Sequence, residues 1–82
     1  MAGINKCIIV GNLGDNPIIN QTKSGETVAN ISVATSEKWR DKTSNELIEK
    51  TEWHRCSIFG KPAEFASKWL VKGSKVYVEG KL

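Results

Sequence analysis

A long stretch of alternating side chains, from Thr27 to about Glu37, most constrains the fold of this chain. Ala29, Ile31 and Val33 alternate there with polar or small residues, and a period of two places them on one face of a β-strand. One side of the strand therefore faces a core, and the other side is mostly polar. A chain of only 82 residues forms at most one small domain, and its core is thin.

Four other segments have the pattern of strands, and one has the pattern of a helix. The helix begins at Gly60-Lys61-Pro62, continues to about Val71 and stops at Gly73, a residue type that commonly ends helices. Residues 40–48 are polar and are expected to form an exposed, mobile loop. The remaining strand candidates, which turn residues separate, are residues 6–12, 18–23, 49–59 and 75–82.

The order of these elements predicts an all-β domain with one helix. Strand, strand, strand, helix, strand fits the OB fold, a five-stranded Greek-key barrel with its helix between strands three and four. The fifth strand is missing, because the chain ends at Leu82 inside a strand-like pattern. We therefore expect residues 1–82 to be one OB-fold domain, incomplete at its C-terminal end, in a truncated chain or an unusually short natural protein. An edge left unpaired in this way invites association.

The first strand candidate, residues 6–12, is apolar without alternation. A strand with water on one side would alternate, so both faces of this strand should be covered. One face would look into the barrel, and a second copy of the chain would cover the other. We expect a homo-oligomer with Cys7 and Ile9 at the subunit contact.

Charge and metal-ligating residues restrict the function only partly. Twelve Lys and Arg residues face nine Asp and Glu residues, a formal charge of +3, which permits nucleic acid if the basic residues gather on one face. An evenly mixed, solvated surface accounts for the total equally well. Two cysteines and one histidine, without a Cys-x-x-Cys pair, favour neither a metal site nor a cofactor. No signal peptide or membrane-spanning stretch is visible, so we expect a cytoplasmic protein with reduced thiols.

The segment 53–59, with the sequence WHRCSIF, points most directly to a function. A period of two places Trp53, Arg55 and Phe59 on one face of a strand. Two aromatic rings and a guanidinium there form a platform on which nucleobases can stack, with a charge for phosphate. Large aromatic residues also serve in cores and interfaces, so spacing alone leaves both roles open. Trp39 is a second stacking candidate, or else it packs the base of the polar loop, and alternation does not fix its direction.

Other candidate residues have competing interpretations. His54 has no nucleophile or metal cluster at a meaningful spacing, so we expect a structural role for it, at a subunit contact. Trp69 is expected to pack the helix together with Phe65, four residues before it, and a DNA contact is the alternative role. The basic residues that could form a track for phosphates are Lys6, Arg40, Lys42, Arg55, Lys61 and Lys72.

These segments together resemble bacterial-type single-stranded-DNA-binding proteins. The matching stretches are residues 5–14, 28–36, 51–55 with 59–61, and 72–80. The resemblance implies OB-fold proteins, usually homotetramers, that coat single strands during replication, recombination and repair. It also implies stacking by Trp39, Trp53 and Phe59, phosphate contacts from Lys6, Arg55, Lys61 and Lys72, and a subunit contact at His54.

The chain departs from this family at several places. A further family tryptophan, the fifth strand and a disordered tail with an acidic tip would lie beyond Leu82. Partners that bind through that tail are therefore not expected for this chain. Trp69 stands where family members often have tyrosine.

Three hypotheses follow for the function. The first is non-catalytic, largely sequence-independent binding of single-stranded DNA, motivated by the face of Trp53, Arg55 and Phe59. The second is an OB-fold adaptor in replication restart, which acts mainly through protein contacts and does not need stacked bases. The third, an enzyme such as a nuclease, has no carboxylate or His/Cys cluster in its favour, so we expect no catalytic activity.

Overall fold

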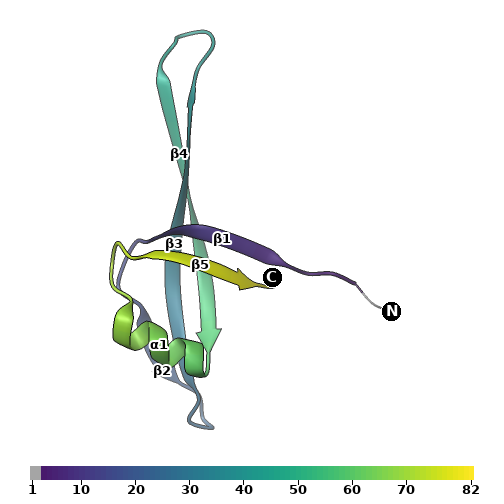
Figure 1. Ribbon diagram of the computed structural model, residues 1–82, viewed down its shortest axis with the longest axis vertical. Helices are drawn as coiled ribbons and strands as arrows, with labels where there is room; N and C mark the ends of the chain where they lie inside the picture. The colour runs from purple at the N-terminus through teal and green to yellow at the C-terminus, as the bar shows by residue number, and fades with distance from the viewer. Residues whose placement is uncertain (1–2) are drawn as a thin grey trace.

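The computed structural model describes residues 3–82, and its main feature is an antiparallel sheet with one helix (Figure 1). A long hairpin of β3 and β4 extends away from a more compact body, where β1, β5 and α1 lie. The outer part of this hairpin, residues 37–52, is called the arm below. The elements are β1 (Cys7–Leu13), β2 (Ile18–Gln21), β3 (Thr27–Arg40), β4 (Leu47–Phe59), α1 (Lys61–Trp69) and β5 (Lys75–Gly80).

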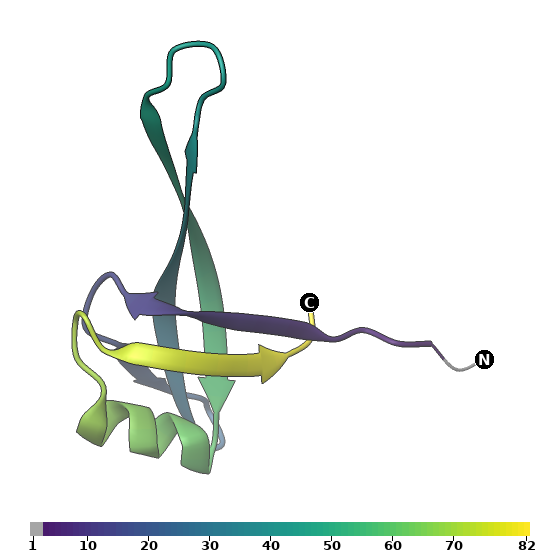
Figure 2. The same ribbon diagram turned by 45° about the horizontal axis from the view of Figure 1, so that its top comes forward.

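The strands curl into an open barrel. Their order is β2-β3-β1-β5, and β4 pairs with the other side of β3. β1 makes the curl, because it pairs with β5 from Cys7 to Asn12 and passes to β3 at Asn12 and Leu13. Figure 2 shows β1 and β5 crossing the β3–β4 hairpin in this way. This partly open Greek-key arrangement confirms the predicted OB fold class.

The core follows the alternation of β3. Ala29, Ile31 and Val33 are buried as predicted, and the last two form a cluster with Leu13 of β1. Gly11 is where β1 crosses β3. A Cβ atom at Gly11 would overlap the Ala34 carbonyl oxygen and would lie 3.0 Å from its carbonyl carbon. The two backbones can approach this closely only because residue 11 has no side chain.

The short strand predicted at residues 18–23 is present, although the expected element order did not count it. That order had three strands before the helix, whereas β2 pairs with β3 from Ile18↔Asn30 to Gln21↔Thr27 as a separate strand of the sheet. Five strands are therefore present in the described chain, although the expected order allowed for four.

The predicted loop at residues 40–48 is wrong in extent. β3 and β4 pair without interruption from Val28↔Phe59 to Arg40↔Leu47, which leaves only residues 41–46 outside the strands. Opposite charges face each other across this polar ladder, at Glu37↔Lys50 and Lys38↔Glu49. Such pairs stabilise a two-stranded ribbon despite its polar composition.

The helix packs through alanines and not through its aromatic residues. Ala63 and Ala66 are buried against Ala29, and these small side chains let the helix approach β3 closely. Phe65 and Trp69 remain 59% and 68% exposed, so the expected packing of Trp69 is wrong. The helix ends at Trp69, two residues before the predicted end, because the next residue is extended. In the part of the chain described, α1 is too short and too polar to cross a membrane.

Candidate nucleic-acid interface

The structure brings Trp53, Arg55 and Phe59 to one face of β4. Their partners on β3 are Ala34, Ser32 and Val28, which alternate with the core residues of that strand. The opposite face of β4 carries Cys56 and Ile58, which pack against the core. Trp53 is 61% exposed and Phe59 is 56% exposed. The two rings are therefore open to solvent on either side of an arginine, as the period of two predicted.

Trp53 rests against the turn that follows β1. A Cβ atom at Gly14 would overlap the six-membered part of the indole, with Cη2 at 2.6 Å. The backbone of Gly14 is itself fixed, since its N–H donates to the Ser32 carbonyl at 3.0 Å. The bare glycine backbone therefore provides the surface on which the Trp53 ring lies. Sequence reasoning missed Gly14, because its contact with Trp53 depends on how β1 crosses the hairpin.

Replacing Gly14 by alanine tests this support. Gly14 is not among the glycines with positive φ, so alanine is compatible with the backbone, but its methyl group would displace the Trp53 ring. We expect affinity for an oligo-dT strand to fall by up to about tenfold, as part of one base-stacking interaction is lost. Fluorescence anisotropy of a labelled strand would measure the affinity. The emission of Trp53 would report the ring in a chain with Trp39 and Trp69 replaced by phenylalanine.

The matched control is Gly80→Ala, because a Cβ atom at Gly80 meets nothing within 4 Å. It should leave both affinity and emission unchanged. Wild-type affinity and emission in Gly14→Ala would show that the ring does not depend on this glycine.

Trp39 lies apart from the other two rings. It pairs with Ile48 in the uninterrupted β3–β4 ladder, so alternation puts it on the face of Ile31 and Val33, opposite to Trp53. It is 45% exposed, because it lies beyond the core in the outer part of the arm, one residue pair before the ladder ends at Arg40↔Leu47. The β3–β4 ribbon twists along its length (Figure 1). A nucleic-acid strand would have to follow that twist to reach Trp39 after Trp53 and Phe59.

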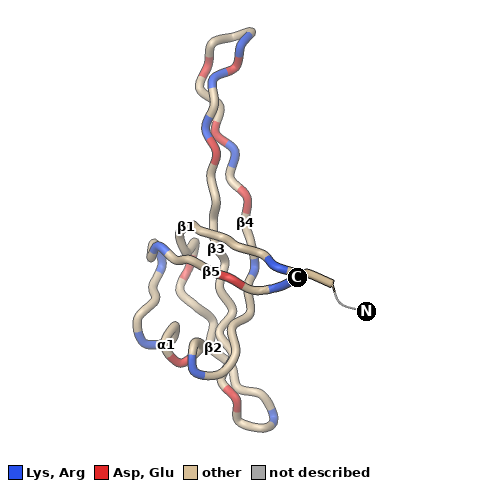
Figure 3. The backbone as a smooth tube through the Cα atoms, turned by 45° about the vertical axis from the view of Figure 1, so that its right-hand side comes forward, with Lys and Arg blue, Asp and Glu red and all other residues tan. Residues whose placement is uncertain are grey.

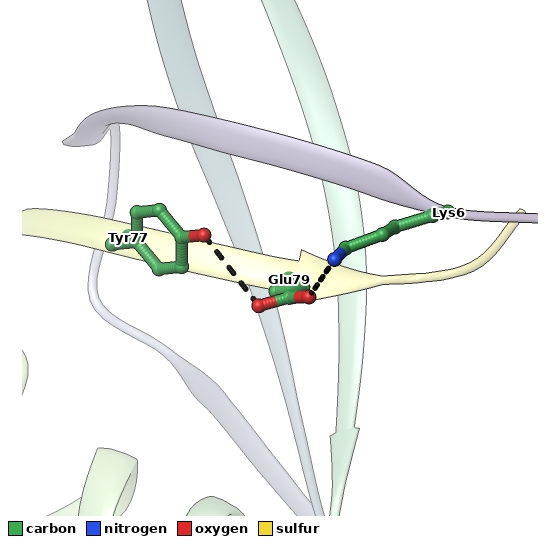
Figure 4. A network of polar contacts seen from close by, with 3 residues as sticks. All are labelled: Lys6, Tyr77 and Glu79. Carbon is green, nitrogen blue, oxygen red and sulfur yellow. Dashed lines mark hydrogen bonds and ion pairs between the residues drawn. The ribbon is translucent and has the colours of Figure 1, made fainter.

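Lys6 is held by an ion pair on the outside of β1 and β5 (Figure 4). Its Nζ lies 2.8 Å from Glu79 Oε1, and the Tyr77 hydroxyl donates to Glu79 Oε2 at 3.5 Å. Both side chains of the ion pair are about half exposed, and such surface pairs contribute little to stability. Among the four basic site residues, Lys6 is therefore the one whose charge is already partly compensated.

The other three predicted phosphate-binding residues are exposed and belong to different elements. Arg55 lies on β4, and Lys61 begins α1 two residues after Phe59. Lys72 lies between α1 and β5, where its backbone N–H donates to Asn16 Oδ1 at 2.8 Å. These three residues therefore come from a strand, a helix and the loop that follows the helix.

The arm adds no net positive charge. Residues 37–52 contain four Lys or Arg and five Asp or Glu residues, which leaves eight basic and four acidic residues for the rest of the chain. Figure 3 shows the two signs alternating along the arm. Arg40 is also engaged within the turn, where it donates to the Asn45 carbonyl at 2.9 Å. Arg40 and Lys42 therefore lie among acidic residues on the arm, and the excess of positive charge lies on the body.

The predicted subunit-contact residues have mixed surroundings. Ile9 packs against the core, and Cys7 is only half-buried on the same side of β1. The neighbouring Ile8 and Val10 are 53% and 50% exposed. These two residues form the apolar outer face of β1. Alternation along the strand puts them on the face opposite to the buried Leu13, and this is the sequence signal that could have identified them as exposed.

His54 lies on the inner face of the hairpin, opposite to Trp53. Its Nε2 is 2.9 Å from the Thr35 hydroxyl, and its cross-strand partner is Val33. The side chain is half-buried. Among residues 3–82, no group of three His, Cys, Asp or Glu side chains could hold a metal ion.

A cleft of about 600 Å³ marks the open side of the barrel, between β4 and the β1–β5 pair. Both cysteines line it, and both are free thiols. Burial raises the pKa of the Cys56 thiol, and the proximity of Cys7 raises this pKa further. Cys56 is therefore held in its neutral, protonated form. Arg55 and Phe59 form part of the rim of the same cleft.

The curled sheet, the helix position and the exposed aromatic face define a small OB-fold domain with an open side. The chain belongs to the single-strand binding protein family, whose model matches residues 4–82. Proteins of this family bind DNA and are not catalytic, which confirms the expectation that the chain is not an enzyme.

The solved structures similar to this chain include the following two. An SSB of Plasmodium falciparum in complex with single-stranded DNA is 39% identical, with a TM-score of 0.88; the match covers 99% of this chain and 72% of that one. A deletion mutant of the single-stranded DNA binding protein from Thermus aquaticus is 28% identical, with a TM-score of 0.82. That match covers 96% of this chain and 38% of the Thermus chain.

Proposed function

We propose that this chain binds single-stranded DNA without strong sequence preference, with bases stacked on Trp53 and Phe59. Arg55, Lys61 and Lys72 contact the phosphates. Lys6 joins them when a phosphate competes with Glu79, and Trp39 provides a further stacking surface on the outer part of the arm. The observation that carries this proposal is the exposed face of Trp53, Arg55 and Phe59, on the side of β4 that faces away from the core.

Exposing large aromatic rings to water has a free-energy cost. Trp53 and Phe59 are each more than half exposed, and burying such rings against a ligand is favourable. Every nucleobase offers a flat π-face, so stacking contributes about 1–3 kcal/mol per base without selecting its identity. Arg55 lies between the rings, where its guanidinium can pair with the phosphate that links two stacked bases.

The proposed phosphate contacts are tested by measuring how the affinity for DNA depends on salt concentration. Four basic contacts on a single strand predict that log affinity falls with log salt concentration by a slope of about −3, at about −0.7 for each neutralised phosphate. Lys72→Ala should reduce the magnitude of this slope by about 0.7. The measurement is a titration of labelled oligo-dT by fluorescence anisotropy at a series of salt concentrations.

Lys23→Ala is the matched control, because Lys23 is an exposed lysine in the turn between β2 and β3, outside the proposed track. It should leave the slope unchanged. An affinity for oligo-dT that does not respond to salt, or equal affinity for a duplex of the same length, would contradict the proposal.

Membership of the family supports a proposal for the biological setting. We propose that the chain protects single strands in the cytoplasm during replication, recombination and repair. It would act as a homo-oligomer, a tetramer or a dimer, in which a second copy covers the apolar outer face of β1, at Ile8 and Val10. The adaptor hypothesis remains the alternative and is tested by the aromatic replacements described in the Discussion.

A further inference from the structure

Lys72 lies in a segment without regular structure, yet its backbone is held at several points. Residues 70–74 connect α1 to β5, and two backbone hydrogen bonds join this segment to Leu13: Gly73 N–H to the Leu13 carbonyl at 2.8 Å, and Leu13 N–H to the Ser74 carbonyl at 2.9 Å. The side chain of Asn12 adds a bond to the Gly73 carbonyl at 3.1 Å.

The bond to Lys72 itself comes from Asn16. Its carboxamide oxygen accepts the Lys72 backbone N–H at 2.8 Å, across 56 residues of sequence. Asn16 is in turn fixed by its neighbour, since its own N–H donates to Asp15 Oδ1 at 2.8 Å. The turn of residues 14–16 thus contacts the Trp53 ring at Gly14 and the Lys72 backbone at Asn16.

We propose that Asn16 is a positioning residue for DNA binding, which fixes the backbone of Lys72 relative to the ring of Trp53. This inference rests on the proposed function, because it assumes that Trp53 stacks a base and that Lys72 contacts a phosphate. A base and its phosphate are linked covalently, so their spacing in a bound strand is restricted. A lysine whose backbone is fixed at a matching distance loses less conformational freedom on binding than one on a free loop.

The test is a double-mutant cycle of Asn16→Ala and Lys72→Ala, with oligo-dT affinity and its salt slope as measurements. Lys72→Ala should reduce the magnitude of the slope by about 0.7. Asn16→Ala should also reduce the magnitude of the salt slope. It should weaken binding by about two- to fivefold, because Lys72 would then lose more conformational freedom when DNA binds. In the Lys72→Ala background, Asn16→Ala should have no further effect. The quenching of Trp53 fluorescence at saturating DNA should stay at the wild-type value.

Asn20→Ala is the matched control, because Asn20 is an exposed asparagine on the neighbouring strand β2. If Asn16→Ala is too unstable to measure, Asn16→Asp is the second variant, because its carboxylate oxygen can still accept the hydrogen bond from the Lys72 backbone N–H. Amide hydrogen exchange at Lys72 should then remain as slow as in the wild type, and the salt slope should still fall when Lys72 is removed.

Three results would overturn the inference: additive effects of the two substitutions, an unchanged slope in Asn16→Ala, or rapid exchange of the Lys72 amide in the wild type. These results differ from failure of the proposed function, in which the wild-type chain does not bind oligo-dT at all.

Discussion

Replacing Trp53 and Phe59 together by alanine is expected to weaken binding of oligo-dT by about 30-fold or more, since each stacked base contributes about 1–3 kcal/mol. Trp39→Ala alone should have a smaller effect, because Trp39 lies on the other face of the β3–β4 ladder. Removing all three rings should abolish detectable binding. Both stacking rings are exposed, so the double variant should keep the wild-type melting temperature. Fluorescence anisotropy and thermal unfolding would measure the two properties.

Phe65→Ala is the matched control, as Phe65 is equally exposed, at 59%, but lies on α1. It should bind oligo-dT as the wild type does. The same variants separate DNA binding from the adaptor hypothesis. An adaptor would keep its protein partner when the three rings are removed, and its weak affinity for DNA would not depend on them.

Gly11→Ala is expected to destabilise the fold strongly. The added methyl group would overlap the Ala34 carbonyl oxygen, a backbone atom that cannot rotate away, and would lie 3.0 Å from Val33 Cγ1. Overpacking of this kind typically costs about 1–3 kcal/mol. For a domain of this size that cost lowers the melting temperature by about 5–20 °C. Thermal unfolding followed by circular dichroism would measure the change.

Gly80→Ala is again the control, since the space around a Cβ atom at Gly80 is open. It should change the melting temperature by only a few degrees, about the shift that a small surface effect produces. A Gly11→Ala chain as stable as the wild type would mean that β1 and β3 can separate at their crossing without cost.

Most of the fold could be predicted because its core follows a local rule. Ala29, Ile31 and Val33 alternate along β3 and are all buried, so the period of two identified both the strand and its inner face. The extent of the arm could not be predicted in this way. Its strands are mostly polar, and residues of opposite charge, Glu37 with Lys50 and Lys38 with Glu49, are cross-strand partners there. This pairing is visible only once the register of the hairpin is known.

The candidate site was predictable to a similar degree. The face of Trp53, Arg55 and Phe59 follows from alternation within one strand, so the sequence alone was sufficient. The direction of Trp39 required the uninterrupted register that the structure provides. The contact of Gly14 with Trp53 and the bond from Asn16 to Lys72 join segments far apart in the sequence. Such contacts depend on how the strands cross, which no local pattern determines.

The arrangement of charge on the arm has a consequence for how DNA would approach the molecule. Basic and acidic side chains there face each other across two strands, so their fields largely cancel beyond a Debye length of about 8–10 Å. A distant polyanion would be drawn to the body and would meet the arm only after the first contact. The arm would then contact a strand that is already bound to the body. Changes in the length of the arm would alter the number of nucleotides that the chain contacts more than the association rate.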